Sequence, residues 1–313
     1  MAPQHKSSIW FYATSWLSYF FWHMFKWLLR RITGKCELQR ICYNHREGAP
    51  RTMRIEKSLR CSKSTLLQNV LSREQHGSVQ ECVSQVMKLK VINQEAHPIF
   101  ALRFGQCLEQ IWSYQALVKE VEMTRLLRYD SLNETHETLL MELWCKLVPE
   151  RQLPSRITKE WSYIGFQGDD PATDFRGMGM LGLHNLLFFA SQYRNAARHV
   201  LQRSHHPKFR YSLAIVGINI TSMAYHLLCC GALKNHMYNT VIGAPSLLHF
   251  HLTYSYLLYE FDKFWFAEEP ADIMEFSRVR EKFLSQVSEY LQSEYARLKL
   301  DISDENMLAP DQG

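Results

Sequence analysis

The sequence lacks the short motifs by which most enzymes hold a nucleotide, a metal ion or an acyl group. No G-x-x-x-x-G-K-[S/T] stretch occurs, so the chain has no phosphate-binding loop of its own. No G-x-S-x-G elbow occurs, which excludes the commonest serine hydrolase arrangement. The eight cysteines include no C-x-x-C pair, which argues against a zinc ribbon or a thioredoxin-like redox site. We therefore expect no bound metal, no resident cofactor and no small-molecule substrate.

Strong charge of one sign is also missing. The formal net charge is only +5, and the cations are scattered along the chain. A nucleic-acid-binding module more often carries a basic stripe with interleaved aromatic residues, so we expect no nucleic-acid partner. Alternating strand patterns, internal repeats and low-complexity linkers are absent as well. Apolar residues make up 46% of the chain, which is the ordinary balance of a folded globular protein.

A hydrophobic run near the N-terminus, at residues 9–29, is about long enough to cross a bilayer as a helix. Its many aromatic residues also suit a helix that lies in the membrane interface, and a helix folded back on the protein core is a third interpretation. More cations follow the run than precede it, which predicts that the main body lies on the cytoplasmic side. We interpret residues 1–35 as a membrane anchor with a basic flank, placing the protein on the cytoplasmic face of intracellular membranes.

The cysteines favour a reducing compartment, because adjacent Cys229 and Cys230 and the scattered remainder make a poor disulfide framework. Cys36 and Cys42 follow the hydrophobic run closely. Thiols in that position are either palmitoylated or plain, and a plain thiol is the commoner case.

Helical periodicity dominates the rest of the chain and predicts an all-α fold, a single multi-helix domain behind the N-terminal hydrophobic helix. We divide it into a helical N-terminal extension packed on the core (36–130), a main domain (131–300) and a disordered tail (301–313). A basic connecting stretch opens the extension and runs through Arg60. The expected helices are Ser64–Ser72, Val79–Lys90, Phe100–Arg125, Asn133–Leu147, a helix from Phe175 or Gly177 to Ala190, Tyr211–Leu228, Leu247–Phe266 and Glu268–Leu300.

Two of these helices, 211–228 and 247–266, are apolar enough to be mistaken for membrane spans. Both carry polar residues, such as Asn219 in the first and Glu260 in the second, which are costly in hydrocarbon. We interpret both as buried core helices. Four histidines form close pairs without a spaced set of further ligands, so we interpret them as structural residues rather than metal ligands: His205, His206, His249 and His251.

The acidic loop at residues 168–171 has turn chemistry, and Thr173 or Asp174 is the expected N-cap of the helix that follows. Three glycines, Gly177, Gly179 and Gly182, then fall in the opening turns of that helix. Each costs roughly 1 kcal/mol relative to alanine in a helix. The usual reason for such a cost is the close approach of another helix or of a partner's backbone.

A single arginine, Arg176, lies between this loop and the glycines. Its planar guanidinium matches phosphate oxygens and stays charged at any relevant pH, so it can reach into the phosphate site of another protein. Alternatively, it forms a salt bridge with a nearby carboxylate of Asp169, Asp170 or Asp174 and holds the loop. On the residues alone, the salt bridge is the simpler interpretation.

Residues 161–189 resemble the signature of the ELMO domain. The matching positions are Trp161, Gly165, Phe166, Gln167, Pro171, Thr173, Asp174, Phe175, Arg176, Gly177, Gly179, Leu181, Gly182, Leu183 and Asn185. The resemblance extends to HPKFRYSLAIVGINIT (206–221), HLTYSYLLYEFDKFWF (251–266) and GKCELQRICYN (34–44), and so covers nearly the whole chain. It identifies residues 131–300 as the ELMO domain, in the compact branch of the family rather than the large engulfment scaffolds.

The resemblance implies a GTPase-activating protein for Arf and Arf-like GTPases, which stimulates its partner and has no catalytic cycle of its own. GTP and magnesium would belong to that partner. The catalytic arginine of the family maps onto Arg176, and the scaffold branch lacks it. We expect Asp174 to cap the helix or orient Arg176, and Gln167 to brace the loop. The remaining supporting or partner-binding positions are Trp161, Gly165, Phe166, Phe175, Gly177, Gly179 and Asn185. The alternative function is a non-catalytic scaffold or effector that binds a small GTPase or an exchange factor.

Overall fold

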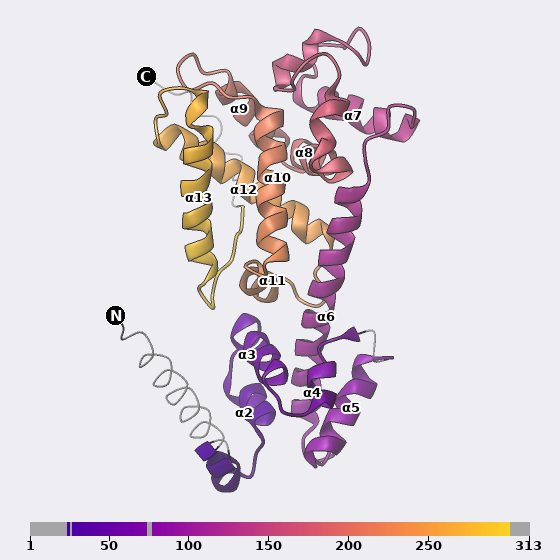
Figure 1. Cartoon of the computed structure of the whole chain (residues 1–313), viewed down its shortest axis with the longest axis vertical. Coiled ribbons are helices and arrows are strands. Elements are labelled where there is room, and N and C mark those ends of the chain that lie inside the picture. Colours follow the sequence, from indigo (N-terminus) through magenta and orange to yellow (C-terminus); the bar gives the residue numbers. More distant parts are fainter. Residues whose placement is uncertain (1–23, 26, 74–76, 301–313) are drawn as a thin grey trace, which may run out of the picture. The chain divides into compact units, whose positions relative to one another are not determined.

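The computed structural model describes residues 24–25, 27–73 and 77–300, which form helices joined by turns and contain no strand (Figure 1). The all-α prediction is confirmed. Most of the hydrophobic run at 9–29, and the tail at 301–313, lie outside the described residues, so both stay predictions. The chain divides into two compact units between Ile111 and Trp112, inside one long helix. The expected division near residue 130 stays a prediction.

Besides the helical residues 27–33, the described part of the first unit contains α2 (Glu37–Asn44), α3 (Ala49–Arg60), α4 (Thr65–Asn69), α5 (Val79–Lys90) and the beginning of α6 (Pro98–Leu126). The expected connecting stretch through Arg60 is wrong, because two helices occupy it. Gly48 turns the chain between them with a φ of 92°, a conformation that glycine adopts without strain. Both helices have only a few apolar residues among charged and polar ones, so their helical periodicity is weak in the sequence. The apolar residues, such as Leu38 and Ile55, are nevertheless buried.

Both cysteines that follow the hydrophobic run are buried in this unit. Cys42 has no exposed surface, and burial raises the pKa of its thiol well above the ordinary value. Cys36 is buried as well. The interpretation of the pair as plain thiols is therefore favoured, and all eight cysteines of the chain are free.

The second unit contains the rest of α6 and the following elements: α7 (Glu134–Leu147), η2 (Lys159–Ile164), η3 (Pro171–Arg176), α8 (Gly179–Gln192), α9 (Arg194–Ser204), α10 (Leu213–Cys229), α11 (Lys234–Thr240), α12 (Leu247–Ala267), η4 (Ile273–Glu275) and α13 (Phe276–Leu291). Helix α10 packs against α8, α9 and α12, while α7 covers α8 and α13 covers α12 (Figure 1). The polar helices α9 and α11 were not expected from periodicity.

The apolar helices α10 and α12 are core helices as predicted. Ile220, Leu228, Tyr254 and Phe261 are fully buried along them. No single helix in the described part of the chain is both long and apolar enough to cross a membrane. By length and composition alone, α10 taken together with α11 across a bend of 87° meets that test.

The C-terminal end is less helical than predicted. The expected helix Glu268–Leu300 is replaced by the short η4 and by α13, which ends at Leu291. Side-chain amides of α11 hold the chain beyond that point: Asn235 donates to the Leu291 carbonyl at 3.0 Å, and Asn239 donates to the Ala296 carbonyl at 3.2 Å. These tertiary hydrogen bonds satisfy carbonyls that would otherwise favour continuing the helix.

The buried side chain of His236 on α11 also binds the chain that follows α13. Its Nδ1 accepts the backbone N–H of Leu298 at 3.0 Å, so the proton of the neutral ring is on Nε2, which donates to Thr253 Oγ1 at 3.2 Å. Burial is the main cause that lowers the pKa of His236 to about 4, and the nearby His249 adds to the effect.

We predict that the free energy of unfolding falls as the pH is lowered from about 6.5 to 4. In this window the unfolded chain binds a proton at His236 and the folded chain does not, so His236 alone accounts for a loss of stability on the order of 3 kcal/mol, and His251, whose folded pKa is also about 4, adds a loss of the same sign. Urea unfolding at several pH values measures this loss. In the His236→Gln variant the slope of stability against pH should be smaller by about one proton. An unchanged slope would contradict the assignment.

Candidate functional site

The loop that carries the ELMO signature rests on a continuous row of aromatic rings. Trp161 packs edge-on against Trp144 and Phe166, with ring centroids 5.5 and 5.8 Å apart. Phe166 contacts Phe175 at 5.5 Å, and Phe175 stacks on Tyr129 at 5.8 Å. Aromatic pairs at such distances are each worth about 0.5–1.5 kcal/mol beyond the area that they bury. The signature aromatics Trp161, Phe166 and Phe175 are buried and therefore support the loop from the core side.

Gly165 ends η2 and turns the chain toward this row. Its φ is 90°, and a Cβ there would lie 2.4 Å from the backbone nitrogen of Leu213. The Gly165 carbonyl accepts the backbone N–H of Ile215 at 3.3 Å. The glycine is therefore required by the close approach of the α10 amino terminus.

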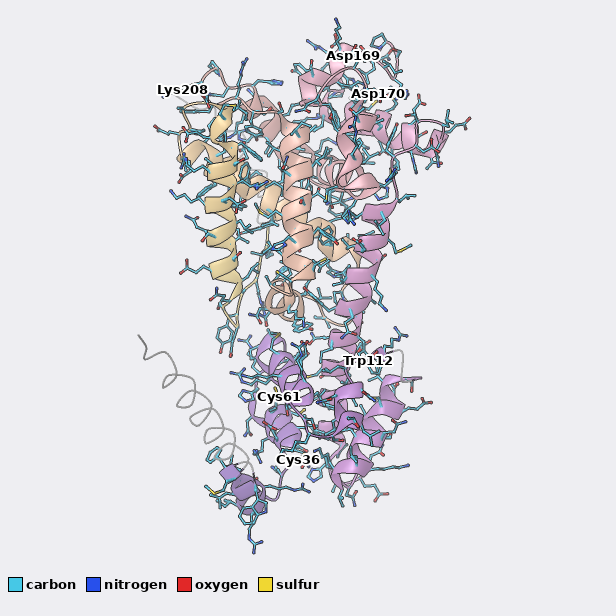
Figure 2. All side chains as sticks on the ribbon, in the orientation of Figure 1. Cys36, Cys61, Trp112, Asp169, Asp170 and Lys208 are labelled. Carbon is cyan, nitrogen blue, oxygen red and sulfur yellow. The ribbon has the colours of Figure 1, made fainter. Side chains whose placement is uncertain are left out.

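The acidic loop is closed by its own hydrogen bonds (Figure 2 labels Asp169 and Asp170 on it). Asp170, not Thr173 or Asp174, is the N-cap of the next element, because Asp170 Oδ1 accepts the Ala172 N–H at 3.0 Å. That element is the 3-10 helix η3, and α8 starts only at Gly179 without a side-chain cap. The predicted cap and the predicted start at 175 or 177 are therefore wrong.

Two carboxylates of the loop are already paired with groups other than Arg176. Asp170 Oδ1 lies 2.8 Å from Nη1 of Arg156. Asp174 Oδ2 accepts the backbone N–H of Gln167 at 2.8 Å. Burial raises the pKa of Asp174, and the Gln167 N–H and the charge of Arg176 partly oppose the rise. Gln167 thus braces the loop through its backbone, while its side chain is exposed.

Arg176 itself is exposed at the end of η3. Its side chain makes no hydrogen bond or salt bridge with any residue that the structure describes. The salt bridge that the residues alone favoured is therefore absent from this part of the chain. An exposed guanidinium on a braced loop keeps its donors available for another molecule.

The three glycines after Arg176 differ in what surrounds them. At Gly179, with a φ of 52°, a Cβ would lie 2.2 Å from the carbonyl oxygen of Arg125. At Gly182 a Cβ would meet the ring of Phe175 at 3.3 Å. At Gly177 a Cβ would meet nothing within 4 Å, and the φ of −83° suits any residue. Close approach of another helix thus explains Gly179, whereas Gly177 faces open space.

Asn185 lies away from the exposed loop. It is fully buried in α8, where its Nδ2 donates to Thr221 Oγ1 at 3.1 Å and its Oδ1 lies 2.6 Å from Nδ1 of His251. Burial, chiefly, lowers the pKa of His251 to about 4, so the ring is neutral at pH 7 and can donate to Asn185. This hydrogen-bonded network joins α8, α10 and α12.

The other histidines also have structural contacts. His205 Nε2 lies 2.8 Å from the Tyr163 carbonyl, and His206 Nδ1 accepts the backbone N–H of Phe209 at 3.1 Å. His249 Nδ1 accepts the Ser246 N–H at 3.1 Å. These contacts support their interpretation as structural residues.

Two arginines near the loop had no signal in the sequence. Arg156 pairs with Asp170, and Nη1 of Arg125 lies 3.4 Å from the Gly177 carbonyl. Both belong to contacts between residues distant in sequence, which neither spacing nor composition reveals.

The comparisons with known proteins agree with the resemblance. The ELMO/CED-12 family matches residues 119–280. Human ELMO domain-containing protein 2 is 53% identical over 269 residues, covering 85% of this chain and 91% of its own. Human ELMO domain-containing protein 1 is 48% identical over 299 residues, covering 88% and 89%. ELMO domain-containing protein B of Dictyostelium discoideum is 35% identical over 276 residues, covering 86% and 95%. No solved structure matches the chain. With a family match over half of its length and relatives covering most of it, the chain belongs to the ELMO/CED-12 family.

Proposed function

We propose that this protein is a GTPase-activating protein for Arf-family or Arf-like GTPases and that Arg176 is the arginine that it inserts into the partner's nucleotide site. The observation that carries the proposal is the exposed guanidinium of Arg176, which makes no hydrogen bond or salt bridge within the described residues, on a loop where Asp170 pairs with Arg156 and Asp174 accepts the Gln167 N–H. Membership of a family whose compact branch resembles this chain supports it.

The chemistry requires little more than this one side chain. During GTP hydrolysis, negative charge builds on the oxygens of the γ-phosphoryl group and of the leaving group, while the GTPase itself holds magnesium and nucleotide. An arginine supplied in trans stabilises that charge and contributes about 10³–10⁵ in rate. The planar fork of Arg176 can donate to two of these oxygens at once, which a single ammonium cannot do.

The bracing of the loop adds to the effect of the charge. The loop is held by the aromatic row below it, by Asp170 at η3 and by the bond from Gln167 to Asp174. Because these contacts exist before any partner binds, less conformational entropy is lost on association. The position of Arg176 is thus prepared in advance.

Single-turnover GTP hydrolysis with a panel of purified Arf and Arf-like GTPases tests the proposal. We expect at least one member to hydrolyse GTP at least about 10³-fold faster when this protein is present. Binding without acceleration by every member would instead support the non-catalytic scaffold or effector. The same panel then identifies the preferred GTPase.

We further propose that residues 9–29 anchor the protein to the cytoplasmic face of an intracellular membrane. Support comes from the apolar length of this run and from the cations that follow it. Deleting residues 1–32 should move the protein from the membrane fraction to the soluble fraction of a cell lysate. Continued sedimentation with membranes would show that another surface holds it there.

A further inference from the structure

The carboxyl end of α6 contacts the segment after Arg176 at several points. Nη1 of Arg125 donates to the Gly177 carbonyl at 3.4 Å, and the Leu127 carbonyl accepts the Met180 N–H at 2.8 Å. Gly179 approaches so closely that a Cβ there would overlap the carbonyl oxygens of Arg125 and Leu127. The backbone that immediately follows the exposed arginine is therefore seated on α6.

The side chain of Arg125 is itself held from two directions. Its Nε and Nη2 donate to the two carboxylate oxygens of Glu122 at 2.7 and 2.8 Å. Its guanidinium carbon lies 5.2 Å from the ring centroid of Tyr225 on α10. Hydrogen bonds from Arg125 and then Tyr225 lower the pKa of Glu122 to about 2, so the carboxylate stays ionised at neutral pH. The guanidinium thus has a fixed direction when it meets Gly177.

The flexible point of this segment is Gly177. It lacks a side chain, its surroundings are open, and it lies between the end of η3 and the start of α8. Glycine loses more conformational freedom than any other residue when it is fixed, so rotation at this point would swing Arg176. A donor on the Gly177 carbonyl restrains that rotation.

We propose that Arg125 is a positioning residue for Arg176: held by Glu122 and Tyr225, it fixes the Gly177 peptide and with it the direction of the catalytic arginine. This inference rests on the proposed function. We assign Arg125 this role rather than that of a second phosphate ligand because three of its N–H donors are directed to Glu122 and Gly177.

Arg125→Gln tests the restraint, with Arg278→Gln as the matched control. Arg278 of α13 forms an (i, i+3) pair with Glu275 of η4, where Nε lies 2.8 Å from Oε2, and its Nη1 lies 3.4 Å from Glu268; both partners lie outside residues 171–180. Hydrogen exchange of the amides in residues 171–180 is the readout that needs no GTPase. We expect exchange there to be about 10-fold faster in Arg125→Gln and unchanged in Arg278→Gln, with α9 unaffected in both.

Kinetics with the most responsive GTPase of the panel give the second readout. We expect Arg125→Gln to lower kcat about 10-fold and to leave KM for the GTPase unchanged, because misplacing a catalytic group weakens the transition state more than binding. Glu122→Gln should act in the same direction with a smaller effect. Arg278→Gln should match the parent.

Each outcome bears on a different part of the inference. Unchanged exchange in residues 171–180 of Arg125→Gln would overturn the restraint, whatever the kinetics. Faster exchange with parental kcat would overturn its role in catalysis. If the parent accelerates no GTPase, the proposed function fails, and the role of Arg125 in catalysis is overturned with it. Faster exchange would then support only the restraint on Gly177.

Discussion

Replacing Arg176 with lysine is expected to abolish the acceleration of GTP hydrolysis, with a loss of about 10³-fold in the single-turnover rate. Lysine keeps the positive charge but offers a point charge in place of a bidentate fork. The side chain is exposed and makes no hydrogen bond or ion pair in the described part of the chain, so the folded state should lose nothing. Helical circular dichroism, thermal midpoint and GTPase binding should all match the parent.

Arg194→Lys is the matched control, because Arg194 is also exposed and belongs to the same unit, at the start of α9. It should accelerate hydrolysis as the parent does. If Arg176→Lys accelerated hydrolysis equally well, Arg176 would not be the catalytic arginine. If both variants lost activity, the effect would not be specific to Arg176, and the assignment of one inserted side chain would fail.

Replacing Gly179 with alanine is expected to destabilise the protein by about 3 kcal/mol or more, and its neighbour Gly177 should tolerate the same change. At Gly179 the left-handed backbone and the overlap with two backbone oxygens each cost on the order of 1–3 kcal/mol. The overlapping atoms are backbone oxygens of Arg125 and Leu127, which cannot move away as the end of a flexible side chain can. A fall of about 5 °C or more in the thermal midpoint corresponds to this loss.

Gly177→Ala provides the control two residues away. Its φ is already favourable and the space around it is empty, so its stability should stay within about 1 kcal/mol of the parent. Urea unfolding of both variants makes the comparison. Equal stability of the two would contradict the assignment of Gly179 to the contact with α6. A stable Gly177→Ala protein with reduced GTPase stimulation would show that a partner's backbone approaches at this point.

Periodicity predicted the long helices well because their burial is regular. Val79–Lys90 has the expected bounds, and α6, α10 and α12 differ from expectation by a few residues. Prediction failed where the helix ends depend on distant groups. Asn235 and Asn239 hold the chain beyond α13, and no pattern within residues 268–300 reveals them. The polar helix α3 was missed for another reason, since its few apolar positions are separated by arginines.

At the candidate site, too, sequence patterns predicted some features, and contacts in the folded chain determined the others. The signature located Arg176 and the aromatic residues around it. Asn185 and Phe175 belong to the same signature, yet the fold buries both, and only packing distinguishes them from a residue that faces outward. The cap at Asp170 was misassigned because several acidic residues in one loop are equivalent by spacing.

By itself, the sequence determined the helical class of this protein, its membership of the ELMO/CED-12 family and the identity of the exposed arginine candidate. These properties reside in residue order, since periodicity and short motifs need no third dimension. Only the tertiary structure decided that Arg176 makes no salt bridge within the described residues, and it shows Arg156 and the Gln167 N–H bound to two of the carboxylates, Asp170 and Asp174, that were its candidate partners. Only the tertiary structure decided that Gly179 has no room for a side chain whereas Gly177 does. The reason is that the carboxyl end of α6, some fifty residues earlier in the chain, packs against Gly179 and not against the Cα of Gly177.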